Sequence, residues 1–307
     1  MKYELTPAQL VPEVIGELSE LPSQEQKDEG QLLRHPSDTF IVAFRELLES
    51  GVQLCQDHKQ ALTTPEDSEK AADVDMRLRL SLRLFHSRVS EYLEACKKII
   101  YSVKPDKEAG KANRSLHDAT KPFYDQAKMI DNFIKHQQRA VRTVYAQWPE
   151  GQMIGYQIEG AIGAGAVGAE PKIHRYPGTA FSVNRALKEY ACDIYFVANA
   201  LKSVLKLPKP IERKRLSELE NLAARFLDLV ADVPLFFLPD EQQLPMPLVK
   251  KRADGTYLLE CPSTTLPANR KPHLMDMKFR FIPSTHALTV EIPYSGIARP
   301  WEKPQKK

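Results

Sequence analysis

The chain has 307 residues and a formal net charge of +3, with 42% hydrophobic and 27% charged residues. These values are ordinary for a soluble globular protein, and so small a net charge does not by itself indicate nucleic-acid binding. Met1–Leu10 lacks the pattern of a signal peptide, and no stretch approaches the ~18 apolar residues of a membrane helix. We therefore expect a cytoplasmic protein.

Helical periodicity dominates the first half of the chain. Residues 1–36 are expected to form an N-terminal arm with a short helix near residues 7–20. Residues 37–148 are expected to form the long-helix part of a bundle, because apolar side chains recur there in steps of four and three, which places them on one helix face. The helix from Ser37 has on that face Phe40, Phe44, Leu47, Gly51 and Leu54.

Two longer helices are expected to follow within this region. The first begins at the capping sequence Thr64–Asp67 and ends before Pro105, and Gly110 and Asn113 mark the next turn. The second contains Pro122 as its start or as a kink and continues to the end of the region. The two apolar seams are Leu78, Leu82, Phe85, Val89, Tyr92, Cys96, Ile99 and Val103, and then Phe123, Ala127, Ile130, Ile134, Gln137, Val141, Val144 and Trp148.

The second half of the chain is more varied. A glycine-rich insertion occupies residues 149–179, and residues 180–233 repeat the helical periodicity of the bundle. Residues 234–307 contain a proline-rich segment, a small β element and a basic tail. Together these patterns predict a mainly α fold: an antiparallel up-and-down helical bundle with a small C-terminal antiparallel β element. The candidate strands are Tyr257–Glu260, Met275–Ile282 and Leu288–Ile292.

The glycine-rich insertion contains a GxGxxG sequence. A dinucleotide-binding loop of this kind must open a helix, and Pro171 follows too soon for that. A hairpin or loop in which two backbones pack closely fits better. The uncharged stretch Ala161–Ala169 also allows membrane contact, as in the small hydrophobic hairpins of some helical pore-forming toxins. The glycines concerned are Gly160, Gly163, Gly165 and Gly168.

Basic residues recur every seven positions along the second long seam. Such a ridge could follow nucleic-acid phosphates or bind another anion, although Asp125 and Asp131 interrupt it. A solvated helix face is the alternative. The ridge residues are Lys121, Lys128, Lys135 and Arg142, with Arg139 beside them.

The stretch from Asp131 to His136 resembles the helix ends of HEPN-like helical bundles, some of which are ribonucleases. Their motif has an arginine, then a polar residue, then a histidine; Asp131 and Asn132 match the polar places, while the arginine is missing. The resemblance covers six residues of motif and, in architecture, residues 37–233. It implies metal-independent RNA cleavage, with His136 and Asn132 as candidate catalytic residues.

The sequence contains no complete catalytic, metal-binding or cofactor-binding constellation. The four cysteines are scattered and the histidines lack ligand spacing, so we expect no metal and no cofactor. We expect a non-catalytic interaction or assembly protein that binds another protein or a second copy of itself. RNA binding or cleavage and membrane contact remain the alternatives. Gln137, the polar member of the second seam, is expected to fix helix register or an oligomer contact.

Overall fold

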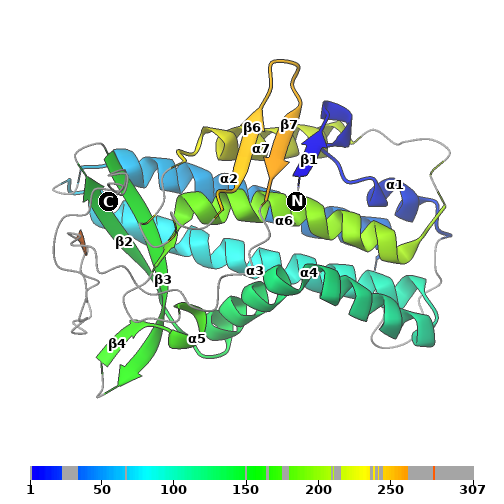
Figure 1. The fold of residues 1–307 in the computed structure, drawn as a ribbon, viewed down its shortest axis with the longest axis horizontal. Coiled ribbons are helices and arrows are strands. Elements are labelled where there is room, and N and C mark those ends of the chain that lie inside the picture. Colours follow the sequence, from blue (N-terminus) through cyan, green and yellow to red (C-terminus); the bar gives the residue numbers. More distant parts are fainter. Residues whose placement is uncertain are drawn as a thin grey trace, which may run out of the picture.

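The structure is a computed structural model that describes residues 2–22, 34–65, 68–148, 151–163, 166–174, 180–208, 210, 216–235, 238, 241, 245–261 and 279–280. The fold is mainly helical, as predicted (Figure 1). The helices are α1 (Val14–Ser19), α2 (Pro36–Thr63), α3 (Ala71–Val103), α4 (Asp106–Lys135), α5 (Pro171–His174), α6 (Val183–Leu205), α7 (Ser217–Asp232) and the short 3-10 helix η1 (Pro7–Gln9). The strands are β1 (Lys2–Leu5), β2 (Val141–Trp148), β3 (Gly151–Gly163), β4 (Ala166–Ala169), β5 (Phe181–Ser182), β6 (Leu248–Lys251), β7 (Tyr257–Glu260) and β8 (Phe279–Arg280).

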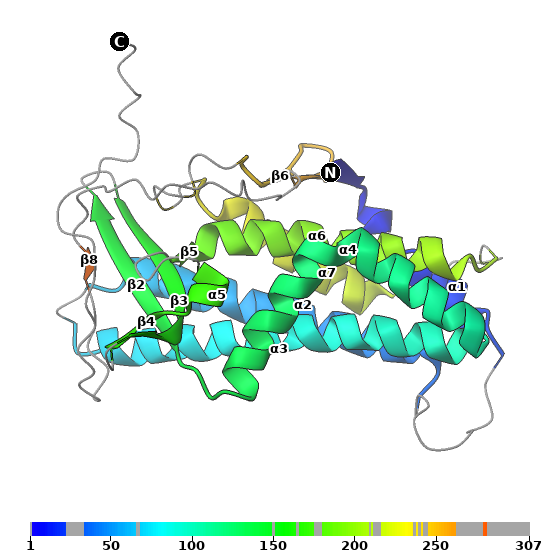
Figure 2. The same ribbon diagram turned by 60° about the horizontal axis from the view of Figure 1, so that its bottom comes forward.

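The long helices lie side by side along the longest axis of the molecule (Figures 1 and 2). Helix α2 packs against α3 and α7, α3 packs against α4, and α4 packs against α6. The apolar faces predicted for α2, α3, α6 and α7 form the core, because burying such side chains is the main favourable contribution to folding. Among the most buried are Phe40, Phe44, Leu78, Phe85, Leu187, Ile194 and Phe226.

The predicted course of the second long seam is wrong beyond Ile134. Helix α4 ends at Lys135, and the chain then turns into strand β2. Gln138 has a φ of +53°, in the left-handed region that commonly follows a helix end, and the N–H of Arg139 donates to the carbonyl of Phe133 at 3.0 Å. Gln137 is exposed in this turn, so it cannot set the register of a helical seam.

Two predicted boundaries near α3 and α4 also differ. Helix α3 begins at Ala71 instead of Thr64–Asp67, of which Glu66 and Asp67 lie outside the described residues. The turn after α3 lies at Lys104 and Pro105, because the proline disfavours a helical conformation in the residue before it. Gly110 and Asn113, the predicted turn, are inside α4.

The first described part of the predicted N-terminal arm, residues 2–22, packs against the hydrophobic core. Strand β1 pairs antiparallel with β7, whose other neighbour is β6, so the sheet order is β1-β7-β6. Leu10, Val14 and Leu18, which follow β1 in the chain, are buried in the hydrophobic core. The short predicted helix is confirmed as α1, and the predicted strand Tyr257–Glu260 is confirmed as β7.

The glycine-rich insertion is a β-hairpin. Strand β3 pairs with β2, β4 and β5 in a second antiparallel sheet, whose order is β4-β3-β2-β8. Gly160 faces Gly168 across the hairpin, and a side chain at Gly160 would lie 2.5 Å from the Cα of Glu170. Close backbone packing therefore explains this glycine. Gly165 and the predicted strand Leu288–Ile292 lie outside the described residues, and of Met275–Ile282 only β8 is described.

Replacing either of two helical glycines by alanine should change the free energy of unfolding in opposite directions. A Cβ at Gly51 of α2 would lie 2.5 Å from Cε2 of Phe226 and 3.2 Å from Cε2 of Phe85, whereas one at Gly110 of α4 would meet no atom within 4 Å. We expect Gly51→Ala to lower the free energy of unfolding by about 1–3 kcal/mol through overpacking. Gly110→Ala should raise it by about 0.5–1 kcal/mol, because alanine favours helices more than glycine does. Urea unfolding of both variants checks this, and a neutral Gly51→Ala would contradict the packing.

Candidate functional site

A cavity of about 300 Å³ lies where α4 and α6 meet α5 and strands β3 and β5. Four aromatic rings line it: Phe123 from α4, Tyr156 from β3, Phe181 from β5 and Tyr190 from α6. The ring centroids of Phe123 and Tyr190 are 5.4 Å apart, and those of Tyr156 and Phe181 are 5.6 Å apart. The cavity therefore has walls built from contacting aromatic pairs, an arrangement typical of small-molecule sites.

Two local features bring these walls together. Pro122 lies inside α4 and removes one backbone hydrogen bond, and the helix is bent near its middle (Figure 2). His174 at the end of α5 accepts a hydrogen bond from the N–H of Ile158 on β3, with an N–N distance of 2.9 Å. The His174 ring also lies 4.5 Å from that of Phe181. This contact fixes α5 on β3 and places Phe181 at the cavity wall.

Arg185 is the main cation among the buried lining residues. Its Nε donates to Glu189 at 2.7 Å, and its terminal nitrogens donate to the carbonyls of Glu241 at 3.3 Å and Pro245 at 2.8 Å. All three nitrogens already bind protein oxygens, and the guanidinium thereby joins Glu241 and Pro245 to α6. Binding an anion would require it to give up these contacts.

Ser182 and Glu241 form a second polar unit at the start of α6. The N–H of Ser182 donates to Oε1 of Glu241 at 3.0 Å, its hydroxyl donates to Oε2, and the same hydroxyl accepts from the N–H of Leu238 at 2.7 Å. A carboxylate at the N-terminus of a helix is stabilised by the helix dipole. With a fully buried and fully bonded hydroxyl, Ser182 is better suited to anchoring this loop than to nucleophilic attack.

Asp193 is a carboxyl of the lining whose pKa is shifted. It lies one helical turn after Glu189 on α6, lines the cavity and is partly buried. Burial, and then the nearby Glu189 charge, raise the pKa of Asp193 to about 8. The positive charge of the N-terminal amino group opposes this shift in the pKa. At neutral pH this side chain therefore holds a proton.

A neutral histidine lies behind the aromatic wall. His86 of α3 is buried, its Nδ1 is 3.1 Å from the hydroxyl of Tyr190, and its ring lies 5.3 Å from that of Tyr156. Burial lowers the pKa of His86 to about 3. Since both tyrosines line the cavity, His86 supports the wall without touching the interior.

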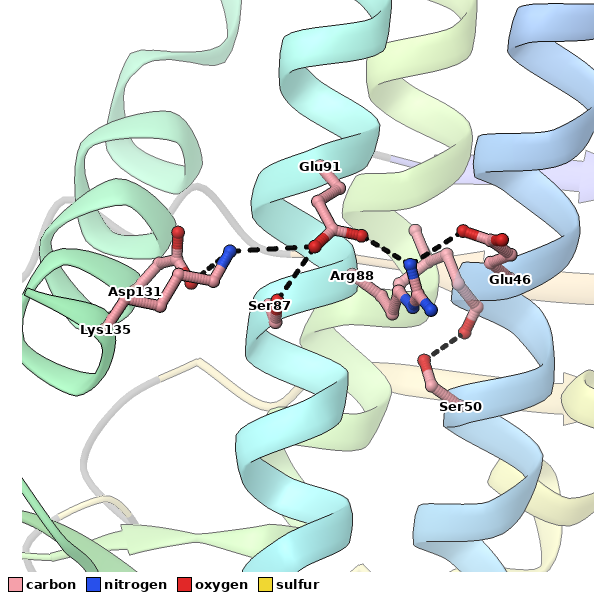
Figure 3. Close-up of polar contacts among 8 residues, drawn as sticks. Glu46, Ser50, Ser87, Arg88, Glu91, Asp131 and Lys135 are labelled. Carbon is pink, nitrogen blue, oxygen red and sulfur yellow. Dashed lines mark hydrogen bonds and ion pairs between the residues drawn. The ribbon is translucent and has the colours of Figure 1, made fainter.

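The ridge residues predicted as anion contacts are engaged in ion pairs. Lys128 pairs with Glu94 of α3 at 2.6 Å, and Lys135 lies 3.6 Å from Glu91 of α3 and 3.2 Å from Asp131. Figure 3 shows this network continuing through Arg88, which binds both Glu91 and Glu46 of α2. These contacts join three helices, and each exposed pair contributes about 0–1 kcal/mol.

The remaining members of the predicted ridge do not extend it. Arg142 lies on β2 and pairs with Glu159 of β3, and Arg139 lies in the turn after α4. Lys121 is exposed on α4, one residue before Pro122. The seven-residue spacing therefore does not form one continuous basic face.

The residues of the HEPN-like motif lie at the end of α4. Asn132 and His136 are exposed, and the N–H of His136 donates to the carbonyl of Asn132 as a helix cap. The cavity lining includes neither of them. The cavity residues were missed from the sequence because α6 looks like an ordinary amphipathic helix. The available signal was its Arg185, Glu189 and Asp193, spaced four apart on one face.

Buried histidines make stability depend on pH. Burial lowers the folded-state pKa of His58 to about 4 and those of His86 and His174 to about 3, below the ordinary 6.5. Their contribution to stability is complete above pH 6.5 and is lost as the pH falls toward 4, because only the unfolded chain binds the protons. We expect the free energy of unfolding to fall between pH 6 and pH 5 by up to ~1.4 kcal/mol per pH unit for each histidine.

Urea unfolding at pH 7, 6 and 5 checks this dependence. His86→Asn keeps a partner for Tyr190 and should reduce the slope by about one proton. The matched control is His136→Asn at an exposed position, which should leave the slope unchanged. Equal slopes for the wild type and His86→Asn would contradict a neutral, buried His86.

Within the part of the chain that the structure describes, no group of three or more His, Cys, Asp or Glu side chains is arranged to hold a metal ion. None of the described helices combines the length and apolar character needed to cross a membrane. Comparison with known family models, curated protein sequences and solved structures finds no match to this chain.

Proposed function

We propose that this chain is a non-catalytic binding protein that takes up a small organic ligand in the cavity between α4 and α6. One observation carries the proposal: a cavity of about 300 Å³ with aromatic walls, lined by both α4 and α6. Protein interiors leave few voids of this size, and voids lined by both rings and polar groups usually bind something.

The internal bonding of the lining supports binding rather than catalysis. Arg185 and Ser182 each make several contacts with protein oxygens, which favours a positioning role over a reactive one. The imidazole of His86 is hydrogen-bonded to Tyr190 and does not line the cavity. A rigid cavity of this kind suits a protein whose interactions respond to a ligand, in keeping with the role in interaction or assembly expected from the sequence.

We place the protein in a reducing compartment, the cytoplasm, as part of the same proposal. None of its four cysteines forms a disulfide and all four are buried, as small hydrophobic side chains of intracellular proteins often are. They are Cys55, Cys96, Cys192 and Cys261.

Filling the cavity tests the function. The neutral fluorescent dye prodan should bind the wild type with a blue-shifted emission and a Kd of roughly 10–300 µM, since ligands of this size gain about 0.3 kcal/mol per heavy atom. Ala186→Trp places an indole in the cavity and should weaken dye binding at least tenfold. Fluorescence titration measures both.

The matched control is Asn199→Trp, which adds the same side chain at an exposed position of the same helix. It should bind the dye like the wild type. If wild-type protein shows no saturable blue shift, or if Ala186→Trp binds the dye as well as the control, the cavity is not the binding site.

A further inference from the structure

We propose that the ligand of this cavity is an uncharged aromatic compound with a carbonyl oxygen, or a similar acceptor, that accepts a hydrogen bond from the hydroxyl of Tyr156. The inference rests on the proposed function, because it names the chemical class that the same cavity selects. Three features of the lining carry it: a buried hydroxyl without a partner, charged groups that are already bound, and the aromatic rings of the walls.

The hydroxyl of Tyr156 is available to a ligand. Tyr156 is 1% exposed and lines the cavity from β3. Among the residues that the structure describes, none makes a hydrogen bond with this hydroxyl, and Tyr156 has only ring contacts and electrostatic interactions. Its oxygen is also not one of the polar atoms that the protein encloses completely without a partner. The hydroxyl therefore reaches the open space that Tyr156 lines, which is the cavity.

This hydroxyl favours an acceptor on the ligand over a donor. Burial holds the pKa of Tyr156 well above its usual value, so the group keeps its proton. A phenol shares an oxygen lone pair with its ring and therefore donates a hydrogen bond more strongly than it accepts one. Because a buried donor without a partner costs free energy, a carbonyl oxygen that accepts from Tyr156 would stabilise the complex.

The buried charged side chains of the lining are already bound within the protein. Arg185 donates to Glu189 and to two carbonyls. Glu241 accepts from both the N–H and the hydroxyl of Ser182. A charged ligand would have to break one of these contacts or remain unpaired away from water, and either costs free energy. The buried lining therefore favours an uncharged ligand.

The less buried charged groups do not favour a charged ligand either. A carboxylate oxygen of Asp125 lies 3.2 Å from Nε2 of His117, and Lys172 is exposed to water. The positive N-terminal amino group already acts on Asp193, which is partly buried. Exposed charges attract an ion only weakly, because water and salt screen them.

The aromatic walls select a flat, apolar body for the ligand. The rings of Tyr156 and Phe181 contact each other at a centroid distance of 5.6 Å. Those of Phe123 and Tyr190 do so at 5.4 Å. Aromatic rings pack in offset or edge-to-face pairs, so an aromatic ligand can add to both. The hydroxyl of Tyr190 is already bonded to His86, whereas that of Tyr156 can bind the ligand.

Titrations of the full chain with ligands of one shape test the inference. 1-Indanone carries the carbonyl, indane lacks it, and indane-1-carboxylate and protonated 1-aminoindane carry opposite charges. At neutral pH, indanone should bind about tenfold or more tightly than either ion. Ligand-observed NMR gives each dissociation constant.

Tyr156→Phe removes the hydroxyl and keeps the ring. It should weaken indanone binding about three- to tenfold, the effect of one hydrogen bond, and change indane binding by less than about twofold. The carbonyl stretching frequency of bound indanone should be lower in the wild type than in the variant, because a hydrogen bond weakens the C=O bond. The variant should unfold at no lower a temperature than the wild type, since the hydroxyl has no partner to lose among the described residues.

The matched control is Tyr195→Phe, which removes another buried hydroxyl, one that donates to the carbonyl of Leu10. Tyr195 does not line the cavity. This variant should unfold at a lower temperature than the wild type and bind indanone within about twofold of it.

The outcomes separate this inference from the function on which it rests. If indanone and indane bind but Tyr156→Phe changes both affinities equally or neither, or if an ion binds more tightly than indanone, the ligand class is wrong and the cavity still stands. If prodan, indanone and indane all fail to bind, the proposed function falls together with the ligand class.

Discussion

The structure depends on helix α6 being held inside the core by its own polar side chains. Lys188 is fully buried, and its Nζ donates to the carbonyl of Val230 in the last turn of α7 at 2.8 Å. A cation at the C-terminus of a helix binds both a free carbonyl and the helix dipole. Burial lowers the pKa of Lys188 to about 8, because removing the ammonium group from water costs free energy. The hydrogen bond to Val230 offsets part of that cost. Without it, a polar group in the middle of the core would be unsatisfied.

The same helix joins two further parts of the fold. The hydroxyl of Tyr195 donates to the carbonyl of Leu10 in the N-terminal segment, and the carbonyl of Ile194 accepts from Tyr92 of α3. These bonds fix the rotation of α6 about its axis. That rotation turns Arg185, Glu189 and Asp193 toward the cavity, so core packing and the candidate site share one cause.

Sequence periodicity correctly predicted the helices that bury one face. It failed after α4, where the chain continues as strand β2 and both faces are buried. In β2 four of the five side chains from Val141 to Tyr145 are buried, on both faces of the strand, and the fifth is the partly exposed Arg142. No regular alternation therefore marks a strand, and Val141 and Val144 continue the helical spacing by coincidence. The stop after α4 is a glutamine in the left-handed region instead of the usual glycine. The cavity was beyond prediction because its residues, from Pro122 to Glu241, meet only through the packing of five elements and one loop.

Because β1 pairs with β7, the fold cannot be completed until the ribosome has synthesised β7. Lys2 faces Glu260 in that pairing, so the first strand to be made must wait for one of the last described strands. Contacts between such distant segments form slowly, since a long loop must close first. Until then the edges of β1 and the apolar side chains of Leu10 and Val14 lack their final partners on the nascent chain. A ribosome-bound chain shorter than about 260 residues is therefore a natural client for chaperones.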